Sequence, residues 1–408
     1  MKLTKGLSVL KKLFLLSSLS YTLLFGEREL SDFLSEDKSQ LLEYQKEQNT
    51  VATQQLKKSW ISPIILQYNK NYTTQFGDPL HTGQFMVSVD QPIFKSGGIW
   101  SAIKYAKALG QANQLDIELQ KRQLISQALT ILYNLKKSKY QLAKLDFTIQ
   151  NDDLDIQIQK EQYEEGLSNR TLYDQALLKR NQDITSKLEL ELNLVKLEND
   201  FSLLSDKSPY SIELPNFGMI DKERYLSNQL ELKRDSFRVE EKKHNNYVTL
   251  SKYLPTVSIT GKYTNEDLNP LFNIPGSSIK TKYYNYGFKV TLPLNINSLN
   301  DVEKSKIEYL NAKVTLDEKR KTLKNSFKLA KKRLEIIDKK IELSKEDAFH
   351  YSSMLGTAQE LEALGDKTAL DTNIVANRVQ IRELDQEIYK LDAQIELLGL
   401  YVNVADAL

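Results

Sequence analysis

The feature that most constrains this chain is a heptad pattern from Leu323 to Val402, interrupted by a glycine, Gly365. On each side of this glycine, mostly apolar residues recur in alternating steps of four and three, the period of a helix packed along a partner helix. The positions are Leu323, Phe327, Ala330, Leu334, Ile337, Ile341, Ser344, Ala348, Tyr351 and Leu355 before it, and Leu370, Ile374, Asn377, Ile381, Leu384, Ile388, Leu391, Ile395, Leu398 and Val402 after it. Arms of about 35 to 65 residues would be on the order of 50 to 100 Å long. The pattern therefore predicts a helical hairpin far taller than a globular domain requires.

The composition predicts few, long elements. The chain has 408 residues but only 15 glycines and 9 prolines, which leaves few turn signals. Acidic and basic residues are interspersed and give a net charge of +2, so charge provides no argument for a nucleic-acid partner. The absence of cysteine excludes disulfides, thiolate catalysis, thiolate metal sites and an acylated amino-terminal cysteine.

No group of residues has the spacing of a catalytic or metal site. The three histidines, His81, His244 and His350, are widely separated and have no ligand spacing. Adjacent carboxylates such as Asp152 and Asp153 are frequent, but nothing predicts an apolar pocket that would divide acid and base roles between them. We therefore expect no catalytic residue, no metal and no cofactor, and we do not expect an enzyme.

Residues 1–26 have the pattern of a secretory signal peptide, with four lysines before an almost uninterrupted apolar run from Leu13 to Phe25. The run is short for a spanning helix, and no other apolar run of about 18 residues occurs. We therefore expect the mature chain to leave the cytoplasm without a helical membrane span. An uncleaved amino-terminal anchor is the alternative, because Leu24-Phe25-Gly26 only loosely meets the small-residue cleavage rule.

Two segments replace helical spacing with strict alternation, and we predict a β-hairpin at 60–94 and another at 254–294. Turn residues from Gly77 to Gly83 divide the first, and a polar loop with Pro270 and Pro275 divides the second. The mainly apolar positions include Ile64, Leu66, Tyr68, Tyr72, Phe85, Val87, Val89, Val257, Ile259, Tyr263, Tyr284, Tyr286, Phe288 and Val290. Each hairpin therefore has one apolar face and one face of amides and hydroxyls.

The order helix, β-hairpin, long helical hairpin occurs twice, which indicates an internal duplication with a period of about 190 residues. The predicted parts are repeat 1 (27–208, with β-hairpin 60–94 and a helical tip near Gly166), a linker (209–220), and repeat 2 (221–408, with β-hairpin 254–294 and a tip near Gly365).

The strands have the pattern of transmembrane β-strands, which alternate over segments of about ten residues. No helix of globular length is predicted to cover the sheet, so its apolar face needs lipid or another chain. Four strands cannot close a membrane barrel, whereas three copies would give about 12 strands and a lumen. A cyclic trimer would also let the helical arms form one cylinder. The alternative is a soluble sheet packed on a core.

Short segments beside the strands resemble motifs of the outer-membrane efflux protein family, whose archetype is TolC. Tyr253-Leu254-Pro255-Thr256-Val257-Ser258-Ile259 resembles the family's strand-opening motif. Gln91-Pro92-Ile93-Phe94-Lys95-Ser96-Gly97-Gly98 is similar to its Pro-Leu-Phe-x-x-Gly-Gly strand exit, and Leu292-Pro293-Leu294 resembles a second copy without the glycine pair. The resemblance covers residues 27–404.

The resemblance implies an α+β membrane protein with two structural repeats. It implies a homotrimer in which a long α-helical coiled-coil barrel adjoins an antiparallel transmembrane β-barrel embedded in outer-membrane lipid. The location implied is the outer membrane of a Gram-negative cell, with the helices extending into the periplasm. The partners implied are a periplasmic adaptor (membrane fusion) protein and an inner-membrane pump of the RND, ABC or MFS type.

The resemblance also implies roles for the helix ends, because Gly166-Leu167-Ser168 with Asp174-Gln175-Ala176, and Gly365 with Asp371, resemble the family's two turns at the periplasmic end. The implied adaptor-docking candidates are Gly166, Leu167, Ser168, Asn169, Gly365, Asp366 and Thr368.

The same comparison implies candidates for an aperture. Asp371 holds the slot of a family aperture residue, and Lys367 lies where the family can place a gate-linking basic residue. In the first repeat Leu172 holds the slot, and the nearest carboxylate is Asp174. Glu362 replaces a gate-linking Tyr of the family, so we expect that latch to be absent or rebuilt. Ile374 stands where some members carry a second acidic ring, which argues against a double ring here.

Charge is unevenly distributed along the predicted rods. From Lys304 to Lys340 there are 13 basic residues against 5 acidic ones, whereas carboxylates cluster between Asp152 and Glu165. The ordinary interpretation of both stretches is a solvated helix face.

We interpret the chain as a passive export duct that serves a tripartite efflux pump or a type I secretion system and is gated at the helix tips. The alternative function is a secreted or envelope-anchored coiled-coil tether or adhesin without a pore.

Overall fold

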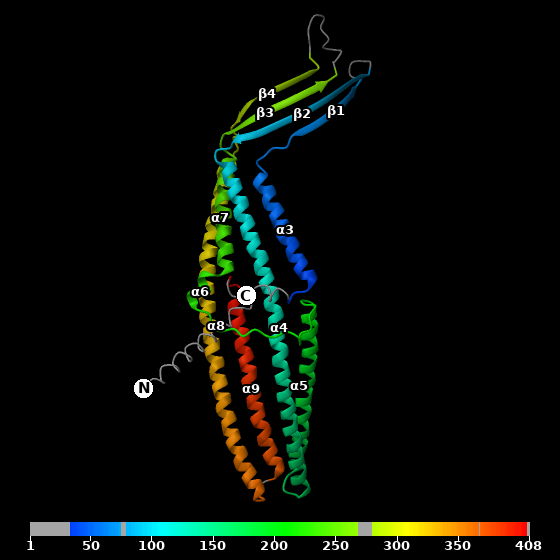
Figure 1. Ribbon diagram of the computed structural model, residues 1–408, viewed down its shortest axis with the longest axis vertical. Helices are drawn as coiled ribbons and strands as arrows, with labels where there is room; N and C mark the ends of the chain where they lie inside the picture. The colour runs from blue at the N-terminus through cyan, green and yellow to red at the C-terminus, as the bar shows by residue number, and fades with distance from the viewer. Residues whose placement is uncertain (1–32, 75–78, 268–279, 367, 406–408) are drawn as a thin grey trace, which may run out of the picture. The chain divides into compact units, whose positions relative to one another are not determined.

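The computed structural model describes residues 33–74, 79–267, 280–366 and 368–405 (Figure 1). The predicted signal peptide, residues 1–26, the predicted turn residues Gly77 and Asp78, and the predicted loop residues Pro270 and Pro275 lie outside the described residues. Gly83, predicted in the first turn, instead pairs with Lys70 inside the sheet. The elements are α3 (Glu36–Lys58), β1 (Ile65–Thr73), β2 (Leu80–Phe94), α4 (Gly98–Glu164), α5 (Arg170–Ser202), α6 (Lys222–Ser227), α7 (Leu230–Ser251), β3 (Thr256–Glu266), β4 (Lys282–Thr291), α8 (Ser298–Ala363) and α9 (Ala369–Tyr401).

The predicted fold class is confirmed: long helical hairpins accompany an antiparallel four-stranded sheet. The two repeats have nearly equal helices, since α4 and α8 have 67 and 66 residues and α5 and α9 have 33 each. Their turn glycines are about 200 residues apart, somewhat more than the predicted period. Within the described part of the chain, no helix is long and apolar enough to cross a bilayer.

The chain divides into two compact units. Among the described residues, unit 1 takes those up to Glu43, those of Glu118–Leu230 and those from Lys321 onward, and unit 2 takes those of Tyr44–Ile117 and Glu231–Arg320. The long helices α4 and α8 contribute residues to both units.

In unit 1, four helices lie in the order α5, α4, α9, α8 (Figure 1). Lys187 of α5 pairs with Asp146 of α4 at 2.7 Å. The opposite side of α4 contacts α9 through two ion pairs of 2.6 Å, Lys137 with Asp392 and Lys144 with Asp385. On the other side of α9, Arg333 of α8 pairs with Glu396 at 3.2 Å. α4 and α9 therefore have a neighbour on each side, whereas α5 and α8 have one each in this row.

The burial of side chains in α8 and α9 reflects the place of each helix in this row. In α8, every predicted heptad position is buried or half-buried. In α9, the predicted heptad accounts for the burial of Ile388, Leu391 and Leu398. Other buried residues lie outside the heptad, among them Thr372, Val375, Val379 and Asp385. The single seam predicted for α9 was too narrow because α9 packs on α4 as well as on α8.

The linker and the carboxyl-terminal residues run across the helices of unit 1. Gln394 of α9 accepts from the Phe217 amide at 2.7 Å and donates to its carbonyl at 3.2 Å. The chain after α9 pairs with the start of α7, where Leu230 donates to Asn403 O at 2.8 Å. Buried Arg122 of α4 donates to Val404 O at 2.8 Å and to Ala405 O at 2.9 Å. These bonds satisfy backbone carbonyls beyond the last turn of α9.

In unit 2, helical contacts follow the order α3, α4, α7, α8. Asn49 of α3 donates to Gly110 O of α4 at 3.0 Å, and a Cβ on Gly110 would lie 2.3 Å from Thr53 Oγ1, so this close approach needs glycine. Arg238 of α7 donates to Asp116 of α4 at 2.8 Å. Ser305 of α8 donates to the side chain of Asn246 of α7 at 2.8 Å. The remainder of unit 2 is the sheet, whose strand order is β1-β2-β3-β4 with antiparallel neighbours throughout.

Candidate functional site

The candidate site has two parts, the helix tips of unit 1 and the sheet of unit 2. At both tips a glycine in the left-handed region ends the long helix, with φ of 75° at Gly166 and 83° at Gly365. Leu167 N donates to Gln162 O at 2.8 Å, and Asp366 N donates to Leu361 O at 2.9 Å. This is the Schellman arrangement, which favours glycine because the left-handed region is strained for residues with a Cβ.

Each return helix begins with a capping residue three positions after the glycine. The Asn169 side chain accepts from Leu172 N at 3.2 Å at the start of α5. At the start of α9, Thr368 and Asp371 form a capping box, in which Asp371 N donates to Thr368 Oγ1 at 3.4 Å. The Thr368 hydroxyl donates to Asp371 Oδ2 at 2.9 Å.

Of the predicted aperture candidates, the structure brings Asp371 together with Thr368. Asp174 lies one turn into α5 and pairs with Arg170 at 3.5 Å, while Glu362 lies in the last turn of α8 and its carbonyl accepts from Gly365 N at 3.0 Å. Lys367 lies outside the described residues. Among the docking candidates, Leu167 is a large apolar side chain in the turn between α4 and α5 and is 76% exposed.

Ion pairs between α4 and α5 were not predicted. Lys179 pairs with Asp152, and Arg180 pairs with Asp153. Partners in each pair lie nearly equally far from Gly166 along the chain, so folding the sequence at that glycine would have found them. Asp152 is buried and its Oδ2 has no hydrogen-bond partner among the described residues. Burial raises the pKa of Asp152, and the hydrogen bond from Lys179 opposes that rise.

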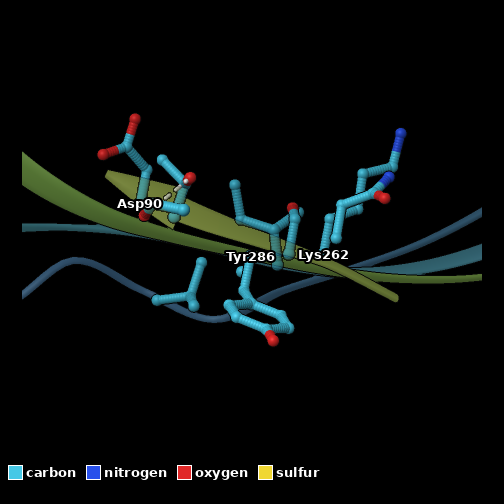
Figure 2. A pocket seen from close by; sticks show the side chains of 10 residues that line it. Asp90, Lys262 and Tyr286 are labelled. Carbon is cyan, nitrogen blue, oxygen red and sulfur yellow. Dashed lines mark hydrogen bonds between the residues drawn. The ribbon is translucent and has the colours of Figure 1, made fainter. Parts of the chain in front are cut away.

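The sheet separates polar from apolar side chains, as the alternation predicted. Figure 2 shows Asp90 and Lys262 on one face and Tyr286 on the other. On the polar face, Lys289 pairs with Asp90, and Gln84 donates to Glu266 at 2.6 Å. Side chains of both faces, with Gly261 and Gly287, line a shallow concavity of about 440 Å³.

The apolar face is open. Tyr284, Tyr286 and Phe288 are 74%, 84% and 78% exposed, and Leu66, Tyr68 and Tyr72 of β1 are exposed too. This observation contradicts the alternative in which the sheet packs on a core within one chain. Because β1 and β4 end the strand order, each has one edge whose backbone groups pair with no strand of the described chain.

No protein-family model and no curated protein matches the sequence. Solved structures do resemble the chain. The outer membrane protein VceC of Vibrio cholerae matches at 13% identity with a TM-score of 0.70, covering 89% of this chain and 93% of VceC. The CmeC outer membrane channel of Campylobacter jejuni matches at 15% identity with a TM-score of 0.68, covering 92% of this chain and 85% of CmeC. The open-state MtrE channel of Neisseria gonorrhoeae matches at 11% identity with a TM-score of 0.60, covering 92% of this chain and 91% of MtrE. The chain therefore has the fold of the TolC-like outer-membrane channels, as its strand and turn motifs predicted.

Proposed function

We propose that this protein is a trimeric channel-tunnel of the outer membrane, the passive exit duct of a tripartite efflux pump or a type I secretion system. The observation that carries the proposal is the sheet, which has one polar face, one exposed apolar face and two open edges. An exposed aromatic and aliphatic face of this kind suits lipid, and a polar face suits a water-filled lumen. The solved structures of the same fold include outer membrane channels, which supports the same location.

Self-association follows from the open edges. A strand edge left unpaired in a membrane leaves donors and acceptors unsatisfied, so β1 of one copy pairs with β4 of the next. Three copies give a barrel of about 12 strands, wide enough for a lumen.

The row of helices in unit 1 supports the same assembly. Leu178, Leu188, Leu192 and Val195 of α5 are exposed, and so are Leu329, Ile336 and Leu343 of α8. In α5, these positions share a heptad with Asn181, Thr185 and Asn199, which are also exposed. The ends of the row therefore carry coiled-coil faces that have no partner within the described chain, and cyclic association would join α5 of one copy to α8 of the next.

The helix tips are the proposed gate and docking region. Three copies of Asp371 around one axis would form an acidic constriction that favours cations and binds divalent ions. Gly166, Leu167, Ser168 and Asn169, with Gly365, Asp366 and Thr368, would receive the adaptor, through which an inner-membrane pump connects. The duct itself needs no catalytic residue, because the pump supplies the energy.

Assembly is tested by native mass measurement of the detergent-purified chain. We expect a trimer for the natural protein and loss of the trimer for Leu188→Glu with Leu192→Glu, because two charges would enter an apolar contact. Gln182→Glu with Asn193→Glu adds the same charge at exposed positions outside the heptad and should leave the trimer intact. A monomer in every case would contradict the proposal.

Conduction is tested in planar bilayers. The trimer should conduct with a preference for cations and should be blocked by divalent cations, and Asp371→Asn should reduce both effects. The Asn side-chain oxygen can still accept the hydrogen bond from the Thr368 hydroxyl, so the helix cap is kept. If selectivity and block are unchanged, the acidic ring is wrong while the channel stands. A chain that stays soluble without detergent and forms no pores would instead support the coiled-coil tether.

A further inference from the structure

A groove in unit 1 combines an apolar floor with a rim of lysines. Its volume is about 750 Å³, and it lies between α8 and the segment that leads into α6. Ile220 and Phe327 are buried, and the Phe327 ring packs against Tyr225 with centroids 5.1 Å apart. The residues that line the groove are Met219, Ile220, Asp221, Lys222, Lys324, Asn325, Phe327, Lys328 and Lys331.

None of the four rim lysines forms an ion pair in the described part of the chain, whereas two neighbouring cations on α8 do. Lys332 pairs with Glu335 at 2.9 Å, and Arg333 pairs with Glu396 at 3.2 Å. The pKa of Glu335 is lowered first by the hydrogen bond from Lys332 and also by the nearby charge of Lys331. All four rim lysines are exposed: Lys222, Lys324, Lys328 and Lys331.

The carboxylate in the lining does not neutralise the rim. Asp221 caps α6, and its Oδ2 accepts from Glu223 N at 2.8 Å and from Arg224 N at 3.3 Å. The groove therefore carries an excess of three positive charges around an apolar floor. Because like charges on neighbouring helix turns repel, this arrangement is stabilised when an anionic group occupies the groove.

The spacing of the lysines indicates what kind of anion fits. Lys324, Lys328 and Lys331 follow steps of four and three on one face of α8, about 6 Å and then about 4.5 Å along the axis. Side chains on one side of an extended peptide repeat every 6.5 to 7 Å or so, close to the longer step. A single inorganic anion could contact only part of this row. A flat lipid surface would not reach Ile220 and Phe327, which lie recessed between the two walls.

We propose that this groove binds an extended acidic segment of a protein partner, with carboxylates at alternate positions on the lysines and an apolar side chain on the floor. Both walls of the groove belong to unit 1. Binding of an acidic segment goes beyond the proposed channel function and does not depend on it. This site lies in the α8 stretch whose basic excess is apparent from the sequence, where solvation is the ordinary explanation. The buried apolar floor distinguishes the groove from a solvated face.

The test is a fluorescence-anisotropy titration of the full-length, detergent-purified chain with a labelled peptide, Glu-Gly-Glu-Leu-Glu-Gly-Glu. We expect saturable binding that weakens with added salt. Lys324→Gln with Lys328→Gln should weaken it by about tenfold or more, since two charge-assisted contacts are lost. Lys339→Gln with Lys345→Gln removes the same charge from exposed positions of α8 outside the groove and should change affinity by less than about twofold. Circular dichroism checks that both variants remain helical, and Lys222→Gln, on the opposite wall, should also weaken binding.

Any of three results would overturn the proposal. The peptide fails to bind saturably, a peptide with Gln in place of Glu binds equally well, or the control variant loses as much affinity as the groove variant. Competition by inorganic phosphate or by phosphatidylglycerol vesicles as effective as by unlabelled peptide would replace the acidic segment by a general anion or a membrane surface.

Discussion

The hairpins α4/α5 and α8/α9 are built alike but are buried differently. Both turn at a glycine with positive φ, and both return helices have 33 residues. Nevertheless, α9 has nine buried residues, whereas α5 has two, Ala176 and Phe201. The difference arises because α9 lies between α4 and α8, while α5 lies at the end of this row of described helices, with α4 on one side (Figure 1). Position in the row, more than the heptad of the helix itself, therefore decides how much of a helix enters the core.

The largest expected effect comes from truncating the core of the inner helix. Leu398→Ala of α9, where the side chain is 1% exposed, should destabilise the chain by about 2 to 5 kcal/mol. Leu192→Ala of α5, 70% exposed, should cost less than about 0.5 kcal/mol in the isolated chain. Urea unfolding followed by circular dichroism measures both. In the proposed trimer, where another copy covers this face, the cost at Leu192 should be larger.

The second effect concerns the ion pairs of the two hairpins. Asp385 of α9 is buried and contacts both Lys144 and Arg382, which are about one-third exposed. Asp385→Ala should destabilise by about 2 to 3 kcal/mol, less than for a fully buried pair because water still reaches both cations. Asp153→Ala, in the pair with Arg180 between α4 and α5, should cost less than about 1 kcal/mol. Equal costs from the same unfolding assay would remove the contrast between the buried pair of α9 and the exposed pair of α4 and α5.

The third effect should be the same in both hairpins. Gly166→Ala and Gly365→Ala each force a Cβ into the left-handed region, at a cost of about 1 to 2 kcal/mol. Neither added Cβ would meet another atom within 4 Å, so backbone strain is the whole cost. Thermal unfolding should show the two variants shifted alike. A marked difference would show that the two turns are not equivalent.

The smallest effect is a pH dependence near the tip of the α4/α5 hairpin. Because burial raises the pKa of Asp152 above its unfolded value, the native state binds the proton more tightly than the unfolded state. The contribution of Asp152 to stability is therefore present at low pH and is lost as pH rises through its raised pKa. Asp152→Asn lacks this loss, so its stability relative to the natural protein should increase from about pH 4 to pH 7. Urea midpoints for both proteins across this range test the sign, and a constant difference would contradict it.

Features that depend on nearby residues could be predicted from the sequence. The heptad identified the buried face of α8, the glycines identified both turns, and strict alternation identified the two faces of the sheet. The family motifs identified the fold, although they lie in a chain that shares at most 15% identity with VceC, CmeC and MtrE.

Features that depend on non-local neighbours appeared only in the tertiary structure. The second buried face of α9, the pairs Lys144 with Asp385 and Lys137 with Asp392, and the lysine groove all join segments far apart in the chain. Asp371 shows the difference at one residue: the sequence proposed it for an aperture, and the structure adds its bond to Thr368 in a helix cap.

The sequence by itself determined that this chain makes two tall helical hairpins and a two-faced sheet, because periodicity and glycine conformation act over one or two helix turns. The tertiary structure decided which helices lie inside the row, which charges are paired and which faces stay open. Those outcomes depend on contacts between segments that periodicity alone cannot align, since each long helix has several faces that a neighbour could cover.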